Sequence, residues 1–367
     1  MMKNSKNKPY WLLIIAALIL VAMIVLIFTI NAKKDDAKTV GLILTGASTD
    51  GGWNGMHYQG VASACETLGV KLLVKENIAE GTGKCAEAVD ELVKEGAGMI
   101  ILSSYAYPVE IKDTIQKYPD ISFYGISAEY YADNMTSYFG RMYQARYLAG
   151  IVAGMKTESD VIGYIAAMPN SEVNRGINAF TLGTKRVNKD AKVKVIWTNE
   201  WENGEKEAEA AETLMQECGA DVLTYHQNQH NVAKTADAAG VYSIGYHATE
   251  EGLSENYLTA AVWDWNALYC QIIREYLQGK GNAVKRHWFG IETGVVGLSE
   301  YSPLVDEAIK AETERAQKEM EQGKNIFSDV IYDNTGKLQC DEGESVSDEI
   351  LLERMTWFVD GVEIYEK

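Results

Sequence analysis

The feature that most constrains this chain is a regular alternation of short apolar runs with amphipathic segments, beginning at residue 40. Runs rich in Val, Ile and Leu predict buried strands, and the segments between them carry apolar residues at helical spacing. In the first half, we expect strands at 40–44, 70–74, 98–104 and 121–126. We expect helices between them at 53–68, 84–95 and 109–118. This alternation predicts an α/β fold with parallel sheets covered on both faces.

The same pattern repeats after residue 141. Its strands are expected at 161–166, 193–198, 221–226, 241–245 and 258–263. Its first helix, 142–155, is rich in Ala and Gly, which predicts close packing on its neighbours. A chain of this length exceeds one compact core, so we expect two doubly wound α/β lobes with a cleft between them. The expected lobes are 37–140 plus about 265–298, and 141–264 plus about 299–367.

Residues 1–36 form a separate segment. Trp11 to Ile30 is a run of twenty residues without a charge, long enough for a helix to span roughly 30 Å of hydrocarbon. Lysines before this run favour a cytoplasmic amino end and an exported remainder. A cleaved signal peptide is the alternative, although its apolar core is normally shorter, about 7–15 residues. We therefore expect a cell-membrane protein with a single-pass anchor and an extracytoplasmic domain.

Charge and short motifs exclude several classes of function. The net charge of −18 repels nucleic acid, so nucleic-acid binding is discarded. The five cysteines form no CxxC pair, and a GTGK stretch at 81–84 lacks the rest of a phosphate loop. His226 and His230 have no evident third ligand, so a polar role is favoured over metal binding. We expect no enzyme activity, no cofactor and no metal.

Polar and aromatic residues recur just after the expected strands. The carboxyl ends of parallel strands are where α/β sheets hold ligands, and aromatic rings can stack on a flat polar molecule. The residues that follow strands and that we select as ligand contacts are Asp50, Trp53, Tyr105, Tyr107, Trp201, His226, Tyr246, His247, Trp263 and Asp264. The abundance of Tyr and Trp in this chain leaves chance as the alternative for any single one of them.

Five segments carry a resemblance to a known family. They are TGASTDGGWNGMHYQG (45–60), YFGRMYQARYLAGIVAGMK (138–156), IGYIAAMPNSEVNRGINAFTLGTKRVN (162–188), VIWTNEWENGEKEAEAAETLMQECGADVLTYH (195–226) and AGVYSIGYHATE (239–250). The chain resembles the basic membrane protein family, the purine-nucleoside-receptor-like substrate-binding proteins of ABC importers. The resemblance implies a type I periplasmic-binding fold, in which two lobes joined by three crossing segments close on a ligand.

The resemblance also implies roles for single residues. Trp53 matches the aromatic that stacks on the base, Asp50 and Asn54 match polar residues beside it, and Trp201 matches a second aromatic. Nucleoside-binding members have an Asp and a Lys that hold the sugar. This sequence has Tyr246 and His247 at the first of these positions, and Trp263 and Asp264 at the second. Without these charged sugar contacts, a free purine base is favoured over a nucleoside.

We therefore expect a membrane-anchored, extracytoplasmic solute-binding protein that captures a purine-like ligand and delivers it to an ABC permease. The permease and its ATPase subunits are the expected partners. The alternative is a tethered sensor that presents the ligand-bound state to a signalling partner. A nucleoside hydrolase would need a cluster of aspartates to bind calcium, and the first loop offers only Asp50.

Overall fold

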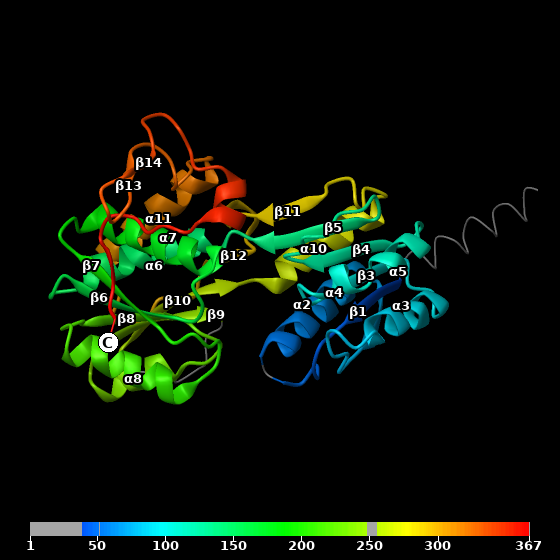
Figure 1. Cartoon of the computed structure of the whole chain (residues 1–367), viewed down its shortest axis with the longest axis horizontal. Coiled ribbons are helices and arrows are strands. Elements are labelled where there is room, and N and C mark those ends of the chain that lie inside the picture. Colours follow the sequence, from blue (N-terminus) through cyan, green and yellow to red (C-terminus); the bar gives the residue numbers. More distant parts are fainter. Residues whose placement is uncertain (1–38, 51, 248–254, 367) are drawn as a thin grey trace, which may run out of the picture. The chain divides into compact units, whose positions relative to one another are not determined.

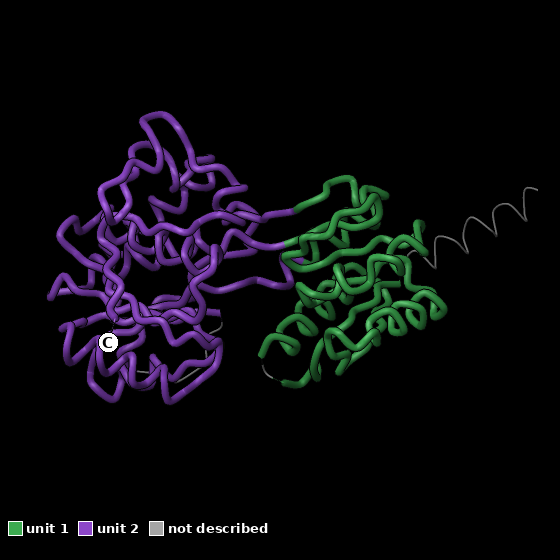
Figure 2. Tube along the Cα trace, viewed as in Figure 1, with its two compact units in different colours: residues 1–138, 269–286 green, residues 139–268, 287–367 purple. Residues whose placement is uncertain are grey.

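The computed structural model of the chain describes residues 39–50, 52–247 and 255–366. These residues form two compact units (Figure 2). The first comprises the described parts of 1–138 and 269–286, and the second those of 139–268 and 287–367. The chain therefore passes from one unit to the other at three places, and each unit is described by itself.

The first unit is built on a sheet with the order β11-β5-β4-β3-β1-β2, in which β1 to β5 pair in parallel. Its strands are β1 (Thr39–Ile43), β2 (Lys71–Lys75), β3 (Met99–Leu102), β4 (Ser122–Ile126), β5 (Met135–Gly140) and β11 (Arg286–Phe289). Strands β1 and β3 are buried along their whole length. Such continuous burial explains why their sequences are uniformly apolar rather than alternating.

Five helices accompany this sheet, namely α2 (Trp53–Leu68), α3 (Lys84–Lys94), α4 (Tyr107–Glu110), α5 (Lys112–Lys117) and α10 (Trp265–Leu277). Val89 and Leu92 of α3 join the hydrophobic core around Ile100 of β3. Helices α2 and α10 meet through a buried pair, His57 Nδ1 and Tyr269 Oη, which lie 2.5 Å apart. The packing of helices against the sheet thus buries the apolar faces that the sequence predicts.

The second unit is built on a sheet with the order β12-β10-β9-β8-β6-β7-β15. Its strands are β6 (Val161–Ala166), β7 (Lys192–Trp197), β8 (Val222–His226), β9 (Tyr242–His247), β10 (Tyr257–Trp263), β12 (Val296–Leu298) and β15 (Val362–Ile364). Strands β6 to β10 are parallel, whereas β12 pairs antiparallel with β10. The order β7-β6-β8-β9-β10 repeats the order β2-β1-β3-β4-β5 of the first unit, which is the flavodoxin-like winding.

Helices cover both faces of the second sheet, with α6 and α7 on one face and α8 on the other (Figure 1). The helices are α6 (Met142–Lys156), α7 (Ser171–Val187), α8 (Gly204–Gln216), α9 (Asn231–Ala238) and α11 (Glu307–Glu321). Helices α6 and α7 pack unusually closely, because a Cβ on Gly150 would lie only 1.9 Å from the carbonyl oxygen of Phe180. The predicted close packing of the small-residue helix is confirmed.

The chain after α11 adds smaller elements to the second unit. Strands β13 (Ile331–Tyr332) and β14 (Leu338–Cys340) form a separate antiparallel pair, and a π-helical turn spans Ile350–Arg354. Strand β15 then pairs in parallel with β7 at the edge of the main sheet. The carboxyl end is therefore part of the α/β unit and not a domain of its own.

The predicted α/β fold with parallel sheets is confirmed, but several short strands were not expected. Strands β5, β11 and β12 lie in segments for which the sequence predicts no strand. Strand β11 leads from the first sheet into the second unit, and the residues after it up to 298, expected in the first lobe, belong to the second unit, where β12 pairs with β10. The predicted anchor at 11–30 lies outside the described residues. Within the described ranges, none of the helices is both long and apolar enough to cross a bilayer.

Candidate functional site

The winding of each sheet marks a specific place for a ligand. In flavodoxin-like sheets, ligands bind beyond the carboxyl ends of the strands where the strand order reverses. In the first unit that place is the junction of β1 and β3, and in the second it is the junction of β6 and β8.

In the first unit, Trp53 connects the ends of the two central strands. Trp53 begins α2, which follows β1, and its indole Nε1 donates a hydrogen bond of 2.9 Å to the carbonyl oxygen of Ser103, just after β3. Its ring also meets the His57 ring edge-on, with centroids 4.2 Å apart. These contacts hold the partly exposed Trp53 side chain at the carboxyl edge of the sheet.

Asp50 and Asn54 hold the loop before α2 in place. The Asp50 carboxylate accepts hydrogen bonds from the Gly52 and Gly55 N–H groups and from the Asn54 amide at 2.8–2.9 Å. Burial alone would raise the pKa of Asp50, but these hydrogen bonds outweigh burial and lower it. The Asn54 side-chain oxygen accepts from Thr45 Oγ1 and the Gly46 N–H group. Both side chains are therefore engaged in fixing the loop that carries Trp53.

The two tyrosines after β3 have different surroundings. Tyr105 is 52% exposed, so its ring is accessible from solvent. Tyr107 is fully buried in the core of the first unit, and its hydroxyl donates to the carbonyl oxygen of Ile78. Tyr107 therefore supports the loops at this edge, whereas Tyr105 keeps an exposed ring while its hydroxyl pairs with Glu129.

In the second unit, four predicted residues form one aromatic array. His226, the last residue of β8, lies between Trp201 and Tyr246, with ring centroids at 5.9 Å and 4.4 Å. Tyr246 stacks in turn on His247, with centroids 4.8 Å apart and planes 9° apart. The array extends from Trp201, which is 38% exposed, to Tyr246, which is buried. It lies at the carboxyl ends of β8 and β9, where a planar ligand can stack.

Burial keeps both histidines of the array neutral near pH 7. Burial is the main cause that lowers the pKa of His226 well below its usual value, and the charge of Arg146 lowers it further. The same two causes lower the pKa of His247 to about 4. A neutral imidazole has one nitrogen that donates and one that accepts a hydrogen bond, which suits recognition of an uncharged polar ring.

These pKa shifts predict how stability depends on pH. Below about pH 6.5 the unfolded chain binds protons at His226 and His247 that the folded chain does not bind, so stability should fall as pH drops toward 4. We expect His247→Asn to flatten this decline, and the melting temperature between pH 4 and 8 measures it. A variant whose melting temperature declines as steeply as that of the wild type would contradict the assignment.

Trp263 and Asp264, at the end of β10, are engaged in packing and capping. Trp263 stacks on Trp265 with centroids 4.7 Å apart and lies against Phe139. The Asp264 carboxylate accepts a 2.8 Å hydrogen bond from the Ala267 N–H group at the start of α10. Asp264 remains exposed, whereas Trp263 is buried.

The structure also brings charged residues to this edge that sequence reasoning did not select. Arg146 of α6 is completely buried, with its guanidinium carbon 4.0 Å from the centroid of the Tyr246 ring. Glu172 and Arg175 lie in the first turns of α7. Burial raises the pKa of Glu172, although the charges of Arg175 and Arg146 oppose this effect. The sequence signal that could have identified Arg146 is its position as the one charged residue in the stretch 142–155.

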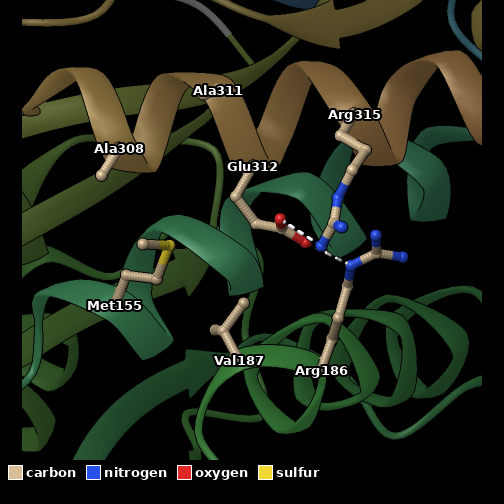
Figure 3. A pocket seen from close by; sticks show the side chains of 7 residues that line it. All are labelled: Met155, Arg186, Val187, Ala308, Ala311, Glu312 and Arg315. Carbon is tan, nitrogen blue, oxygen red and sulfur yellow. Dashed lines mark hydrogen bonds and ion pairs between the residues drawn. The ribbon is translucent and has the colours of Figure 1, made fainter.

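A groove elsewhere on the second unit has the features of a structural junction. It runs between α11 and the ends of α6 and α7 (Figure 3). Arg186 donates from Nε to Glu312 at 2.7 Å, and Arg315 pairs with the same carboxylate. Arg186 also forms two 2.8 Å hydrogen bonds with Glu319. These charges pair with one another, and the ion pairs of Arg186 attach α11 to α7.

Metal ligation finds no support among the residues that the structure describes, since no three His, Cys, Asp or Glu side chains lie close enough together to hold an ion. His230, considered with His226 as a metal ligand, instead has its Nδ1 2.7 Å from Tyr225 Oη.

Comparisons with known proteins agree with the fold and identify the family. The family model Bmp, described as ABC transporter substrate-binding protein PnrA-like, matches residues 37–328. A purine-binding protein of Brucella abortus is 30% identical over 336 residues, which are 90% of this chain and 95% of that protein. A putative ABC transporter glucose-binding protein of Haloferax volcanii is 36% identical over 280 residues, 76% of this chain and 68% of that protein.

A solved structure gives independent support for the fold alone. The ABC transporter solute-binding protein from Conexibacter woesei aligns with a TM-score of 0.67 at 19% identity, over 79% of this chain and 99% of that chain. The architecture is therefore a periplasmic-binding-like α/β fold with parallel sheets. The matched family consists of binding proteins and not of enzymes. The chain belongs to the Bmp family, the PnrA-like substrate-binding proteins of ABC transporters.

Proposed function

We propose that this ABC transporter substrate-binding protein captures a purine-like ligand and delivers it to a permease. The observation that carries the proposal is the array of Trp201, His226, Tyr246 and His247 at the carboxyl ends of strands in the second unit. Flat aromatic rings with neutral imidazoles suit a flat, uncharged heterocycle. The similarity to a purine-binding protein along nearly the whole chain supports the same ligand class.

A free base is favoured over a nucleoside, because the residues where a sugar would need charged contacts are otherwise engaged. Tyr246 and His247 stack on each other, and Trp263 stacks on Trp265. The Asp264 carboxylate caps α10. Tyr246 and Trp263 carry no charge near pH 7, burial keeps His247 neutral, and the exposed Asp264 carboxylate already has one oxygen in the cap. We propose the Trp53 ring, at the carboxyl edge of the first unit's sheet, as a further ligand contact.

Calorimetric titration of the full chain in detergent tests this proposal. Adenine and hypoxanthine should bind more tightly than adenosine and inosine, since a ribose would have to displace packed aromatic rings. Tighter binding of the nucleosides would refute the preference for bases. Glucose belongs in the same series, because the 36% identical relative favours a sugar as the second candidate ligand. Binding of glucose without any purine would replace the first proposal with the second.

The cellular role follows from the family and from the uncharged run at 11–30. We propose that this run anchors the protein in the cell membrane, with the two units outside the cytoplasm. Tethering would raise the effective concentration of the ligand-bound protein at its permease. Copurification of the full chain with ABC permease and ATPase subunits is the expected result, whereas copurification with a signalling receptor would favour the tethered sensor.

A further inference from the structure

Arg146 is a buried cation whose hydrogen bonds are missing. It is 0% exposed, and none of its three guanidinium nitrogens has a hydrogen-bond partner in the described part of the chain. Burying an unpaired charge is strongly unfavourable, and native proteins leave few buried donors unsatisfied. A guanidinium in this state is therefore expected to bind an acceptor other than the residues that the structure describes.

Two more unpartnered polar atoms lie beside Arg146. Tyr164 Oη and His226 Nδ1 are buried and have no hydrogen-bond partner among the described residues. All three residues surround Gly176 of α7. A Cβ at this glycine would lie 3.6 Å from Tyr164 Oη, 3.7 Å from His226 Nδ1 and 4.0 Å from Arg146 Cγ. The two unpartnered atoms and the aliphatic stem of Arg146 therefore lie next to one another around Gly176.

The aromatic rings orient the guanidinium. The Arg146 guanidinium carbon lies 4.0 Å from the centroid of the Tyr246 ring and 5.6 Å from that of Tyr164. A guanidinium over a ring gains cation–π attraction through its face and keeps its N–H groups at the edge for planar acceptors. Because Tyr246 also touches His226, this arrangement is continuous with the aromatic array at the ends of β8 and β9.

The nearby carboxylate does not complete Arg146. The charge of Arg175 affects the pKa of Glu172 more than the charge of Arg146 does. No hydrogen bond joins Glu172 to Arg146. Arg175 donates one hydrogen bond of 3.3 Å to the carbonyl oxygen of Leu351 and stands 5.5 Å from the Trp288 ring centroid. Within the described ranges, the donors of Arg146 thus remain available to an acceptor such as a ligand.

We propose that Arg146, together with Tyr164 and His226, binds the oxo edge of the ligand and selects 6-oxopurines over 6-aminopurines. A guanidinium only donates hydrogen bonds, and the O6 and N7 atoms of a 6-oxopurine are adjacent acceptors that match its fork. Adenine presents a donor, its 6-amino group, where O6 would be. This inference rests on the proposed function and adds the chemical subclass of the ligand.

Titration of the full chain in detergent with hypoxanthine and with adenine tests the inference, because the two bases differ at position 6. The wild type should bind hypoxanthine more tightly by roughly 5- to 150-fold, the discrimination expected of one bidentate arginine contact. Arg146→Met should abolish this preference, mainly by weakening hypoxanthine binding. A wild type that binds adenine at least as tightly as hypoxanthine would overturn the inference while leaving the proposed function in place.

Two further variants separate selectivity from folding. Tyr164→Phe removes a hydroxyl that has no partner, so it should fold normally and reduce hypoxanthine affinity several-fold with little change for adenine. Arg186→Met is the matched control, because that arginine pairs with Glu312 and Glu319 away from the array, and it should keep the preference. If Arg146→Met and Tyr164→Phe both fold and keep the preference, Arg146 is structural. If no purine binds the wild type, the proposed function fails and this inference fails with it.

Discussion

Replacing Trp53 with alanine is expected to weaken purine binding by roughly 10- to 100-fold, because stacking on an aromatic side chain is worth about 1–3 kcal/mol per base. The Trp53 ring is held in place by its 2.9 Å hydrogen bond to Ser103 and by the edge of His57. A preorganised ring loses little entropy when a ligand stacks on it, so removing the ring should lower the affinity for the ligand. Calorimetric titration of the full chain with the base that the wild type prefers measures the effect.

The control for this change is Trp53→Phe. Phenylalanine keeps an aromatic face but cannot donate to Ser103, so affinity should fall only several-fold. Trp201→Ala should also weaken binding, but by a smaller factor. Trp201 is 38% exposed, and the centroid of its ring lies 5.9 Å from that of its neighbour His226. Circular dichroism confirms that each variant folds. Unchanged affinity in the Trp53→Ala variant would show that the ligand binds elsewhere.

Replacing Gly150 with alanine is expected to destabilise the second unit by about 3 kcal/mol or more, at the upper end of the range for overpacking. The new methyl group would lie 1.9 Å from the Phe180 carbonyl oxygen, and that oxygen belongs to the backbone of α7 and cannot rotate away. Gly183 of α7 makes the reciprocal contact, 1.9 Å from the Tyr147 carbonyl oxygen. Helix propensity alone would favour alanine by about 1 kcal/mol, so the sign of the effect distinguishes packing from propensity.

Thermal denaturation of the full chain, followed by circular dichroism, measures this loss. The matched control is Gly297→Ala in β12 of the same unit, since a Cβ there would meet nothing within 4 Å. That variant should melt within a few degrees of the wild type. A Gly150→Ala protein that melts at the wild-type temperature would mean that α6 and α7 can separate without cost.

The positions of many candidate-site residues could be predicted from the sequence, because they follow strands whose apolar character is local. Trp53, Trp201 and His226 were selected from their positions after expected strands, and the structure places them at the carboxyl ends of the sheets. The same reasoning selected Tyr107, which the structure buries in the core. Position after a strand thus indicates the edge of the sheet but does not determine which side of the loop a ring faces.

The sequence by itself determined the α/β alternation and the family, because both depend on patterns within continuous segments. Short strands such as β5, β11 and β12 were missed, since their pairing with distant strands, rather than an apolar run, defines them. Only the tertiary structure decided that Arg146, Tyr164 and His226 converge around Gly176. These residues come from different helices and strands, and the order β7-β6-β8-β9-β10, with α6 and α7 packed on it, sets the distances between them.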